Sequence, residues 1–352
     1  MNRNETKRVQ IGNIFLGGNN QILIQSMCSI KTSHIKKVIK QINECADLGA
    51  DLMRVSILDF KDAYAIKEIV NNIKIPLICD IHYNYKFALI AIKSGAKKIR
   101  LNPGNLNNKE EIEKIVNLAK KYNVAIRIGV NSGSLNQNIV RKYSNLETYK
   151  LIVLSAIEYI KILENFDFYN IVISLKSSNL FDTIQAYREF SKISNYPLHI
   201  GLTESGFDEV GIIRSVACLS PLLLDNIGNT IRISLTNDPK KEILTCKRLL
   251  HDLNLYPNYP TLISCPTCGR CEVKIKSLAR KTLDFLEKNN VNITVAIMGC
   301  AVNGIGEGKK ADIGLAGGKN KFIIFKKGKF FKEVKESEAL NELFKEILLI
   351  KH

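Results

Sequence analysis

The stretch PLICDIH at residues 76–82 and the stretch KKIRLN at residues 97–102 are short, largely apolar runs, each with polar residues two positions apart, such as Asp80 with His82 and Arg100 with Asn102. An amphipathic segment separates them. Runs of this kind recur at spacings that are mostly between 20 and 30 residues: 21–27, 51–57, 76–82, 97–102, 124–131, 171–177, 197–204 and 230–236. Because a strand, its crossover helix and two turns occupy about this length, the pattern predicts an α/β fold with an eight-stranded (β/α)8 TIM-like barrel.

The intervening segments have apolar residues at helical spacing, as in residues 36–46, 61–71 and 109–121. The longest gap, between the fifth and sixth runs, predicts a longer helix over 146–164. A doubly wound sheet is the competing fold, but its glycine-rich turn should follow the first strand, where this chain has Ser26-Met27-Cys28-Ser29.

The Pro- and Tyr-rich segment at 256–260 predicts a domain boundary. We therefore expect a barrel domain over 1–255 and a small α/β domain over 256–352. In the second domain the pattern predicts a helix over 274–288, a strand and Gly-rich turn over 294–304, a strand pair within 321–334 and a closing helix from Ser337.

The composition excludes a disordered chain, since 45% of the 352 residues are hydrophobic. No run approaches the roughly 18 apolar residues of a membrane span, and no secretory leader is evident, so we expect a cytoplasmic protein with no membrane contact.

The net charge of +17 raises the alternative of a basic nucleic-acid-binding barrel with a structural zinc knuckle. Because the lysines are scattered over expected helix surfaces and the C-terminal tail, we favour a solvated surface and expect no nucleic acid partner.

Polar residues within the eight runs share one face of each strand, because side chains alternate with period two. Since the C-terminal ends of barrel strands build the active face, these side chains should converge on one pocket. The candidates are Arg54, Asp80, His82, Arg100, Asn102, Arg127, Asn131, Ser174, Lys176, His199, Thr203 and Arg232. Asp51, Asp80 and Glu204 could form structural ion pairs, but five cations exceed so few acids, and the surplus predicts an anionic ligand such as a diphosphate.

Four cysteines cluster toward the C-terminus: Cys265, Cys268 and Cys271 at two-residue separations, and Cys300 after an expected strand. The other five are scattered among apolar neighbours and are expected to be buried packing residues. A zinc ribbon needs a second matched pair of ligands, which is missing, so an iron–sulfur cluster is favoured. Spacing leaves its fourth ligand open between Cys271 and Glu307. The three-then-two cysteine spacing of radical-SAM enzymes is absent from the sequence, so that class is not supported.

The chain resembles the bacterial 4-hydroxy-3-methylbut-2-enyl diphosphate synthases of the methylerythritol phosphate pathway, over nearly its whole length. The resemblance rests on Arg54-Val55-Ser56, Asp80-Ile81-His82, residues 100–105 (RLNPGN), residues 127–131 (RIGVN), residues 201–206 (GLTESG), residues 265–268 (CPTC) and residues 299–304 (GCAVNG). It implies reductive ring opening and dehydration of 2-C-methyl-D-erythritol 2,4-cyclodiphosphate with two electrons from flavodoxin or ferredoxin, and a homodimer.

The resemblance also implies a 4Fe-4S cluster on Cys265, Cys268, Cys300 and Glu307. It implies diphosphate binding by Arg54, Arg100, Arg127, Lys176 and Arg232, with Asn131 and His82 orienting the substrate and Asn102 beside them. Glu204, at the end of the seventh run, is the expected proton donor. Five positions depart from the family pattern: Ile305 replaces a proline, Arg214 a lysine, Asn226 a glycine and Asn229 an aspartate, and Cys271 stands where no cysteine is expected.

Overall fold

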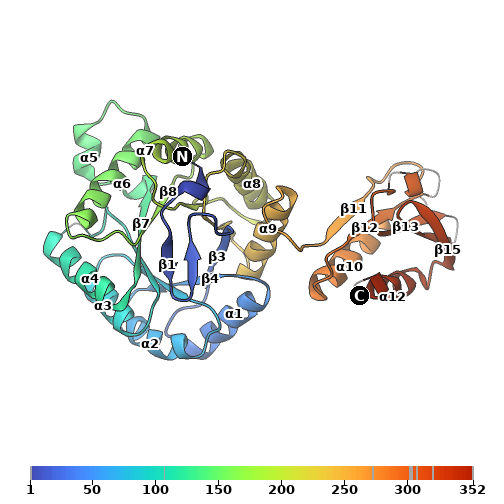
Figure 1. The fold of residues 1–352 in the computed structure, drawn as a ribbon, viewed down its shortest axis with the longest axis horizontal. Helices are drawn as coiled ribbons and strands as arrows, with labels where there is room; N and C mark the ends of the chain where they lie inside the picture. The colour runs from blue at the N-terminus through green and yellow to red at the C-terminus, as the bar shows by residue number, and fades with distance from the viewer. Residues whose placement is uncertain are drawn as a thin grey trace. The chain divides into compact units, whose positions relative to one another are not determined.

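The computed structural model describes residues 2–106, 108–271, 273–300, 304–306, 308–318 and 321–350. The chain divides into two compact units, residues 1–256 and 257–352. Each unit has its own sheet and its own hydrophobic core (Figure 1). Among the described helices, none combines the length and the apolar character that crossing a bilayer requires.

The first unit is the predicted parallel eight-stranded barrel. All eight predicted strands form, in the sheet order β8-β7-β6-β5-β4-β3-β10-β9, and one parallel bridge between Ile173 and Leu198 joins the two ends. The strands are β3 (Leu23–Met27), β4 (Leu52–Ile57), β5 (Leu77–Ile81), β6 (Lys98–Leu101), β7 (Ala125–Asn131), β8 (Ile171–Lys176), β9 (His199–Ile200) and β10 (Thr230–Ile231). The last two are shorter than the sequence predicted, so the polar residues that follow them lie on loops.

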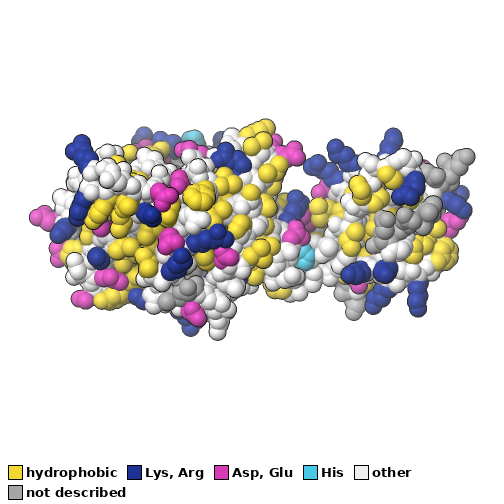
Figure 2. Space-filling model, turned by 90° about the horizontal axis from the view of Figure 1, so that it is seen from above, with side chains coloured by type: hydrophobic (Ala, Val, Ile, Leu, Met, Phe, Trp, Pro, Cys, Tyr) yellow, Lys and Arg dark blue, Asp and Glu magenta, His cyan; other side chains and the backbone are white. Residues whose placement is uncertain are grey.

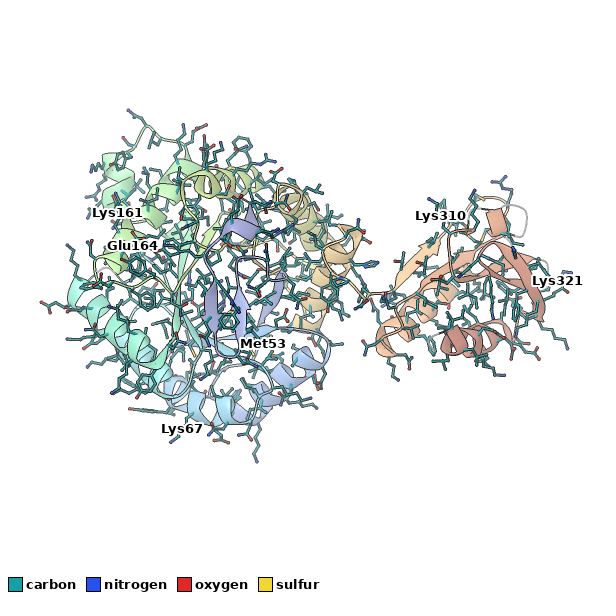
Figure 3. All side chains as sticks on the ribbon, in the orientation of Figure 1. Met53, Lys67, Lys161, Glu164, Lys310 and Lys321 are labelled. Atoms are coloured by element: carbon teal, nitrogen blue, oxygen red, sulfur yellow. The ribbon has the colours of Figure 1, made fainter. Side chains whose placement is uncertain are left out.

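Helices cover the outside of this barrel (Figure 1): α1 (Ile35–Asp47), α2 (Phe60–Asn71), α3 (Tyr85–Lys93), α4 (Lys109–Tyr122), α5 (Gln137–Lys142), α6 (Thr148–Glu164), α7 (Leu180–Ile193), α8 (Asp208–Leu224) and α9 (Pro239–Asp252). Short polar caps start many of them, as in α4, where Asn108 accepts bonds from the backbone N–H groups of Glu110 and Glu111. Figure 3 shows Lys67 and Lys161 on the outer helices and Met53, which is fully buried, inside the molecule.

A hairpin that the sequence analysis did not predict, β1 (Val9–Ile11) with β2 (Ile14–Leu16), supplies part of the barrel floor. Its apolar side chains pack against Leu23, Leu52, Ile78, Ala125 and Val172, which lie at the first inward position of five strands. Apolar contacts therefore fill most of the N-terminal end of the barrel, where the buried Lys98 lies level with Ile78 and Ala125, and the pocket residues lie in the layers above it.

The second unit has one five-stranded sheet in the order β11-β12-β13-β14-β15. Its strands are β11 (Thr261–Ser264), β12 (Thr294–Met298), β13 (Ile313–Gly318), β14 (Lys321–Lys326) and β15 (Lys329–Lys335), and its helices are α10 (Ile275–Lys288) and α12 (Ala339–Ile350). Strands β11, β12 and β13 are parallel, so Cys265 and Cys300 follow the C-terminal ends of two neighbouring strands. Strands β11 and β13 had not been predicted.

Candidate active site

A hollow of about 220 Å³ lies at the C-terminal ends of the barrel strands. Seven of the eight predicted substrate-binding residues line it, and its full lining is Arg54, Asp80, His82, Arg100, Arg127, Asn131, Ser174, Lys176, Leu202, Thr203, Arg232 and Ser234. The strand register explains this convergence, because Asp80 pairs with Arg100 and Arg100 with Arg127 across adjacent strands. Period-two alternation then turns all of these side chains inward.

Two larger hollows occur on the first unit, but neither has this chemistry. One of about 450 Å³ is lined by Gly12, Val70, Pro76 and Lys97 near the N-terminal ends of strands, and one of about 430 Å³ lies between α6 and α7. Barrel enzymes build their active sites at the C-terminal ends of the strands. The smaller, more polar hollow is therefore the candidate active site.

Asp80 is the central acid of the hollow. Its carboxylate lies 3.1 Å from Arg100 Nη1, 3.7 Å from Arg54 Nε and 3.6 Å from His82 Nε2. Burial raises the pKa of Asp80, but the Arg54 guanidinium, the His82 hydrogen bond and Arg100 together outweigh burial and hold that pKa far below its usual range. Asp80 is therefore ionised and orients two guanidiniums at once.

Arg232 is held by a second buried carboxylate, Glu242 on α9, which the sequence analysis missed. Arg232 Nη2 and Nε donate to the two Glu242 oxygens at 3.0 and 3.1 Å, a bidentate pair. The same carboxylate accepts from Ser26 Oγ at 2.6 Å and from the Leu235 N–H at 3.0 Å. A signal was present in the sequence, since Glu242 precedes Cys246 and Leu249 on the apolar stripe of its helix and is buried with them.

Several cationic nitrogens remain without a partner. Arg127 is 2% exposed, and its Nε and Nη1 atoms have no hydrogen-bond partner among the described residues, nor does Arg100 Nε. Burial, followed by the charge of Arg127, lowers the pKa of Lys176 well below its usual range. Four guanidiniums and the Lys176 amine thus face two carboxylates, and leaving buried donors unpaired costs about 1–3 kcal/mol each. The arrangement is suited to a multiply charged anion with several acceptor oxygens.

Two glycines make room for these cations. A Cβ atom on Gly129 would lie 2.3 Å from Arg100 Nε, and one on Gly201 would lie 2.6 Å from Lys176 Nζ and 2.7 Å from the Arg232 carbonyl oxygen. Neither glycine has a positive φ, so space and not backbone conformation requires them. The site is therefore shaped by small residues as much as by charged ones.

Three residues predicted to face the pocket lie elsewhere. Asn102 is buried outside the lining, where its amide donates to Ser134 Oγ and its oxygen accepts from the Gly104 N–H. His199 is fully buried and is bonded through Nδ1 to Thr230 Oγ1 at 2.7 Å. Glu204 is exposed on the loop after β9, next to the lining residue Thr203, with a φ of 51° that non-glycine residues rarely adopt. Substrate contact by Asn102 and proton donation by Glu204 stay predictions.

The cysteine loop of the second unit gathers at Gly299. A Cβ atom there would lie 2.7 Å from Cys271 Sγ and 3.6 Å from Cys265 Sγ, and the Gly299 N–H donates to Cys265 Sγ at 3.2 Å. Cys300 is the next residue, and Cys268 is exposed on the same loop. No three His, Cys, Asp or Glu side chains of the described residues converge as they would on a single metal ion. A cluster spaces its ligand sulfurs more widely, since each binds a different iron atom.

Glu307, the predicted fourth ligand, lies outside the described residues. The neighbouring Ile305, which departs from the family pattern, packs in a small apolar cluster with Met298, Ala316 and Phe325. Of the five scattered cysteines, Cys45, Cys79, Cys218 and Cys246 are buried, and burial raises the pKa of Cys246 to about 12. Such thiols are inert packing groups, unlike those at the edge of the second sheet.

Comparisons with known proteins place both units. A family model described as the GcpE TIM-barrel domain matches residues 6–247, and one described as the GcpE protein C-terminal domain matches residues 261–348. The chain is 46% identical over 345 residues to a 4-hydroxy-3-methylbut-2-en-1-yl diphosphate synthase (flavodoxin) from Clostridium perfringens, covering 98% of this chain and 99% of the relative. It is also 46% identical over 350 residues to a protein of the same name from Malacoplasma penetrans, covering 99% and 96%.

Among solved structures, a dihydropteroate synthase from Stenotrophomonas maltophilia matches with a TM-score of 0.52 and 11% identity, covering 71% of this chain and 98% of that one. At this identity the likeness concerns the barrel fold alone. None of these comparisons supports the alternative of a nucleic-acid-binding barrel.

Proposed function

Since the chain belongs to the GcpE family of flavodoxin-dependent 4-hydroxy-3-methylbut-2-en-1-yl diphosphate synthases, we propose that its barrel hollow grips the diphosphate of the substrate while its C-terminal cysteines hold the reducing cluster. The reaction is the reductive ring opening of 2-C-methyl-D-erythritol 2,4-cyclodiphosphate with loss of water, in isoprenoid precursor synthesis. It is an oxidoreductase reaction in which the barrel residues bind the substrate and the cysteine-bound cluster supplies the electrons.

The observation that carries the proposal is the set of unpartnered buried donors on Arg127 and Arg100. A diphosphate presents several acceptor oxygens and at least two negative charges, so it satisfies these donors and balances the surplus of cations. Arg54 and Arg232 are already oriented by Asp80 and Glu242, so binding orders few additional side chains.

For the cofactor we propose a 4Fe-4S cluster on Cys265, Cys268, Cys300 and Glu307. Soft thiolates suit iron–sulfur iron, and the Gly299 N–H that donates to Cys265 Sγ is the kind of hydrogen bond that tunes such sulfurs. When bound, the cluster supplies two electrons, one at a time, for breaking the C–O bond at C2 of the substrate.

The chain's own residues hold and protect the reacting groups. The guanidiniums of Arg54, Arg100 and Arg127 stabilise the negative charge that develops on the phosphate oxygen released from C2. His82 and Asn131, on the rim of the hollow, orient the ring, and Glu204 donates the proton with which the C3 hydroxyl leaves as water. Asn102 holds the loop that follows β6.

We also propose the electron donor, the oligomeric state, the cellular location and the domain division of the enzyme. The electron donor is flavodoxin, which the names of the relatives specify, or ferredoxin. The enzyme acts as a homodimer, it works in the cytoplasm, and residues 1–255 and 256–352 form its substrate and cluster domains.

Anaerobic turnover of the cyclic diphosphate with dithionite tests this proposal. We expect ring-opened product from cluster-replete protein, a loss of at least a hundredfold in kcat/KM for Arg127→Met, and about four irons per chain in the wild type. Cluster-replete protein that makes no product would refute the assignment. Full iron content in a Glu307→Ala variant would refute the proposed fourth ligand.

A further inference from the structure

The start of helix α10 carries four exposed cations directly after the cysteine loop. Lys274, Lys276, Arg280 and Lys281 are all exposed, and none forms an ion pair within the part of the chain that the structure describes. Lys274 is the N-cap residue of α10 and makes no side-chain capping bond, and the first turn contains no acidic residue.

These cations do not serve the helix. The N-terminal end of a helix carries partial positive charge, so the cations at its start, Lys274 and Lys276, destabilise it. Helix α4 of the same chain shows the usual arrangement, with Glu110 and Glu111 in its first turn and Lys120 and Lys121 in its last. Helix α1 likewise begins with Lys36 and Lys37 and has no acidic residue in its first turn, so the α10 cations are distinguished by their place beside the cysteine loop and not by this pattern.

Four lysines elsewhere on the second unit form ion pairs, whereas Lys309, Lys310 and Lys329 form none among the described residues. Glu333, Glu346 and Glu342 pair with Lys321, Lys326 and Lys332 at 2.8, 2.7 and 2.8 Å, respectively. Figure 2 shows Lys and Arg side chains prominent over this unit, with fewer acidic ones. Cations without an ion pair among the described residues therefore occur at several places on this unit, and those at the beginning of α10 are the ones that follow the cysteine loop.

The position of these cations connects them to electron transfer. Ser264 at the end of β11 pairs with Ile297 near the end of β12, so the cysteine loop and Gly299 both lie at the C-terminal ends of these two strands. Helix α10 begins at the same end of the strands, four residues after Cys271, and its first two turns extend only about 11 Å. Because electron transfer slows steeply with distance, a donor must approach the cysteines from the side on which these strands end.

We propose that Lys274, Lys276, Arg280 and Lys281 form the docking surface for the electron donor, a protein with acidic side chains around its redox group. This inference rests on the proposed function, since it assumes that the neighbouring cysteines hold the cluster. Complementary charge raises the association rate and selects the orientation, while adding little affinity per pair. The docking is accordingly rapid, reversible and sensitive to salt.

The test compares Lys276→Glu/Arg280→Glu with Lys329→Glu. Lys329 is exposed and has no ion pair among the described residues. It lies at the opposite end of the strands, at the turn between β14 and β15, where its backbone is in register with Lys326. Binding of purified oxidised flavodoxin is measured by calorimetry, and turnover is measured with reduced flavodoxin and, separately, with dithionite.

We expect the double variant to raise the Kd and the KM for flavodoxin about tenfold at low salt, since two reversed surface charges remove roughly 1.4 kcal/mol. Dithionite-driven turnover should stay within twofold of the wild type, and Lys329→Glu should change neither quantity.

Equal flavodoxin binding by the double variant and the Lys329→Glu control would overturn the proposal. So would a loss of dithionite-driven turnover confined to the double variant, because the cations would then serve the substrate. Flavodoxin binding without turnover by the wild type would refute the proposed function and leave the docking surface standing.

Discussion

Replacement of Glu242 by glutamine tests whether a buried carboxylate behind the pocket controls both folding and substrate binding. The Glu242 side chain is 3% exposed and accepts four hydrogen bonds, two of them from Arg232. Glutamine keeps the volume but turns one acceptor oxygen into an NH2 group, which cannot accept from Arg232 or Ser26. Removing one partner of a buried ion pair costs about 3–5 kcal/mol. Because Arg232 is 14% exposed and opens onto the pocket, we expect about 2–4 kcal/mol.

Urea unfolding of the barrel, followed by far-UV circular dichroism, measures this loss. The KM for the cyclic diphosphate should also rise about tenfold, since Arg232 is no longer fixed, and that corresponds to roughly 1.4 kcal/mol. Glu44→Gln is the matched control: its pair with Lys240 is 41% exposed on both sides, so less than about 1 kcal/mol should be lost. Equal destabilisation by the two substitutions, or an unchanged KM in Glu242→Gln, would refute the reasoning.

Three further predictions concern the pocket and the cysteine loop. Gly201→Ala places a methyl group where Lys176 Nζ and a backbone oxygen now lie, so the KM should rise at least tenfold; a wild-type KM would show that the site yields easily. Burial and Arg127 lower the pKa of Lys176 and a bound diphosphate raises it again, so binding should take up protons and weaken as pH rises. Calorimetry of pyrophosphate binding in two buffers checks this, and a heat independent of the buffer would contradict it. Anaerobic iron analysis should show cluster loss in Cys268→Ser and retention in Cys271→Ser; the reverse result would make Cys271 the ligand.

The sequence was sufficient for the strands and for most of the pocket. Period-two alternation in the inward face of β5, β6 and β7 placed Asp80, Arg100 and Arg127 together, because adjacent parallel strands leave no other direction for those side chains. It was less reliable at β9 and β10, which end early. His199 and Glu204 were consequently expected at the pocket, whereas one lies deeper in the barrel and the other on an exposed loop.

Long-range contacts were beyond the sequence pattern. The bond between Ser26 and Glu242 joins residues 216 positions apart, and no local period specifies that Glu242 on α9 will accept from both Ser26 and Arg232. The convergence of Cys265 and Cys271 at Gly299 likewise depends on the pairing of β11 with β12. Periodicity and residue chemistry by themselves determined the barrel, the cationic face and the clustered thiols, because these follow from repeats along one strand or loop. Only the tertiary structure decided which cations are neutralised, which donors stay unpaired and where glycine must leave space, because those properties belong to pairs of residues distant in the chain.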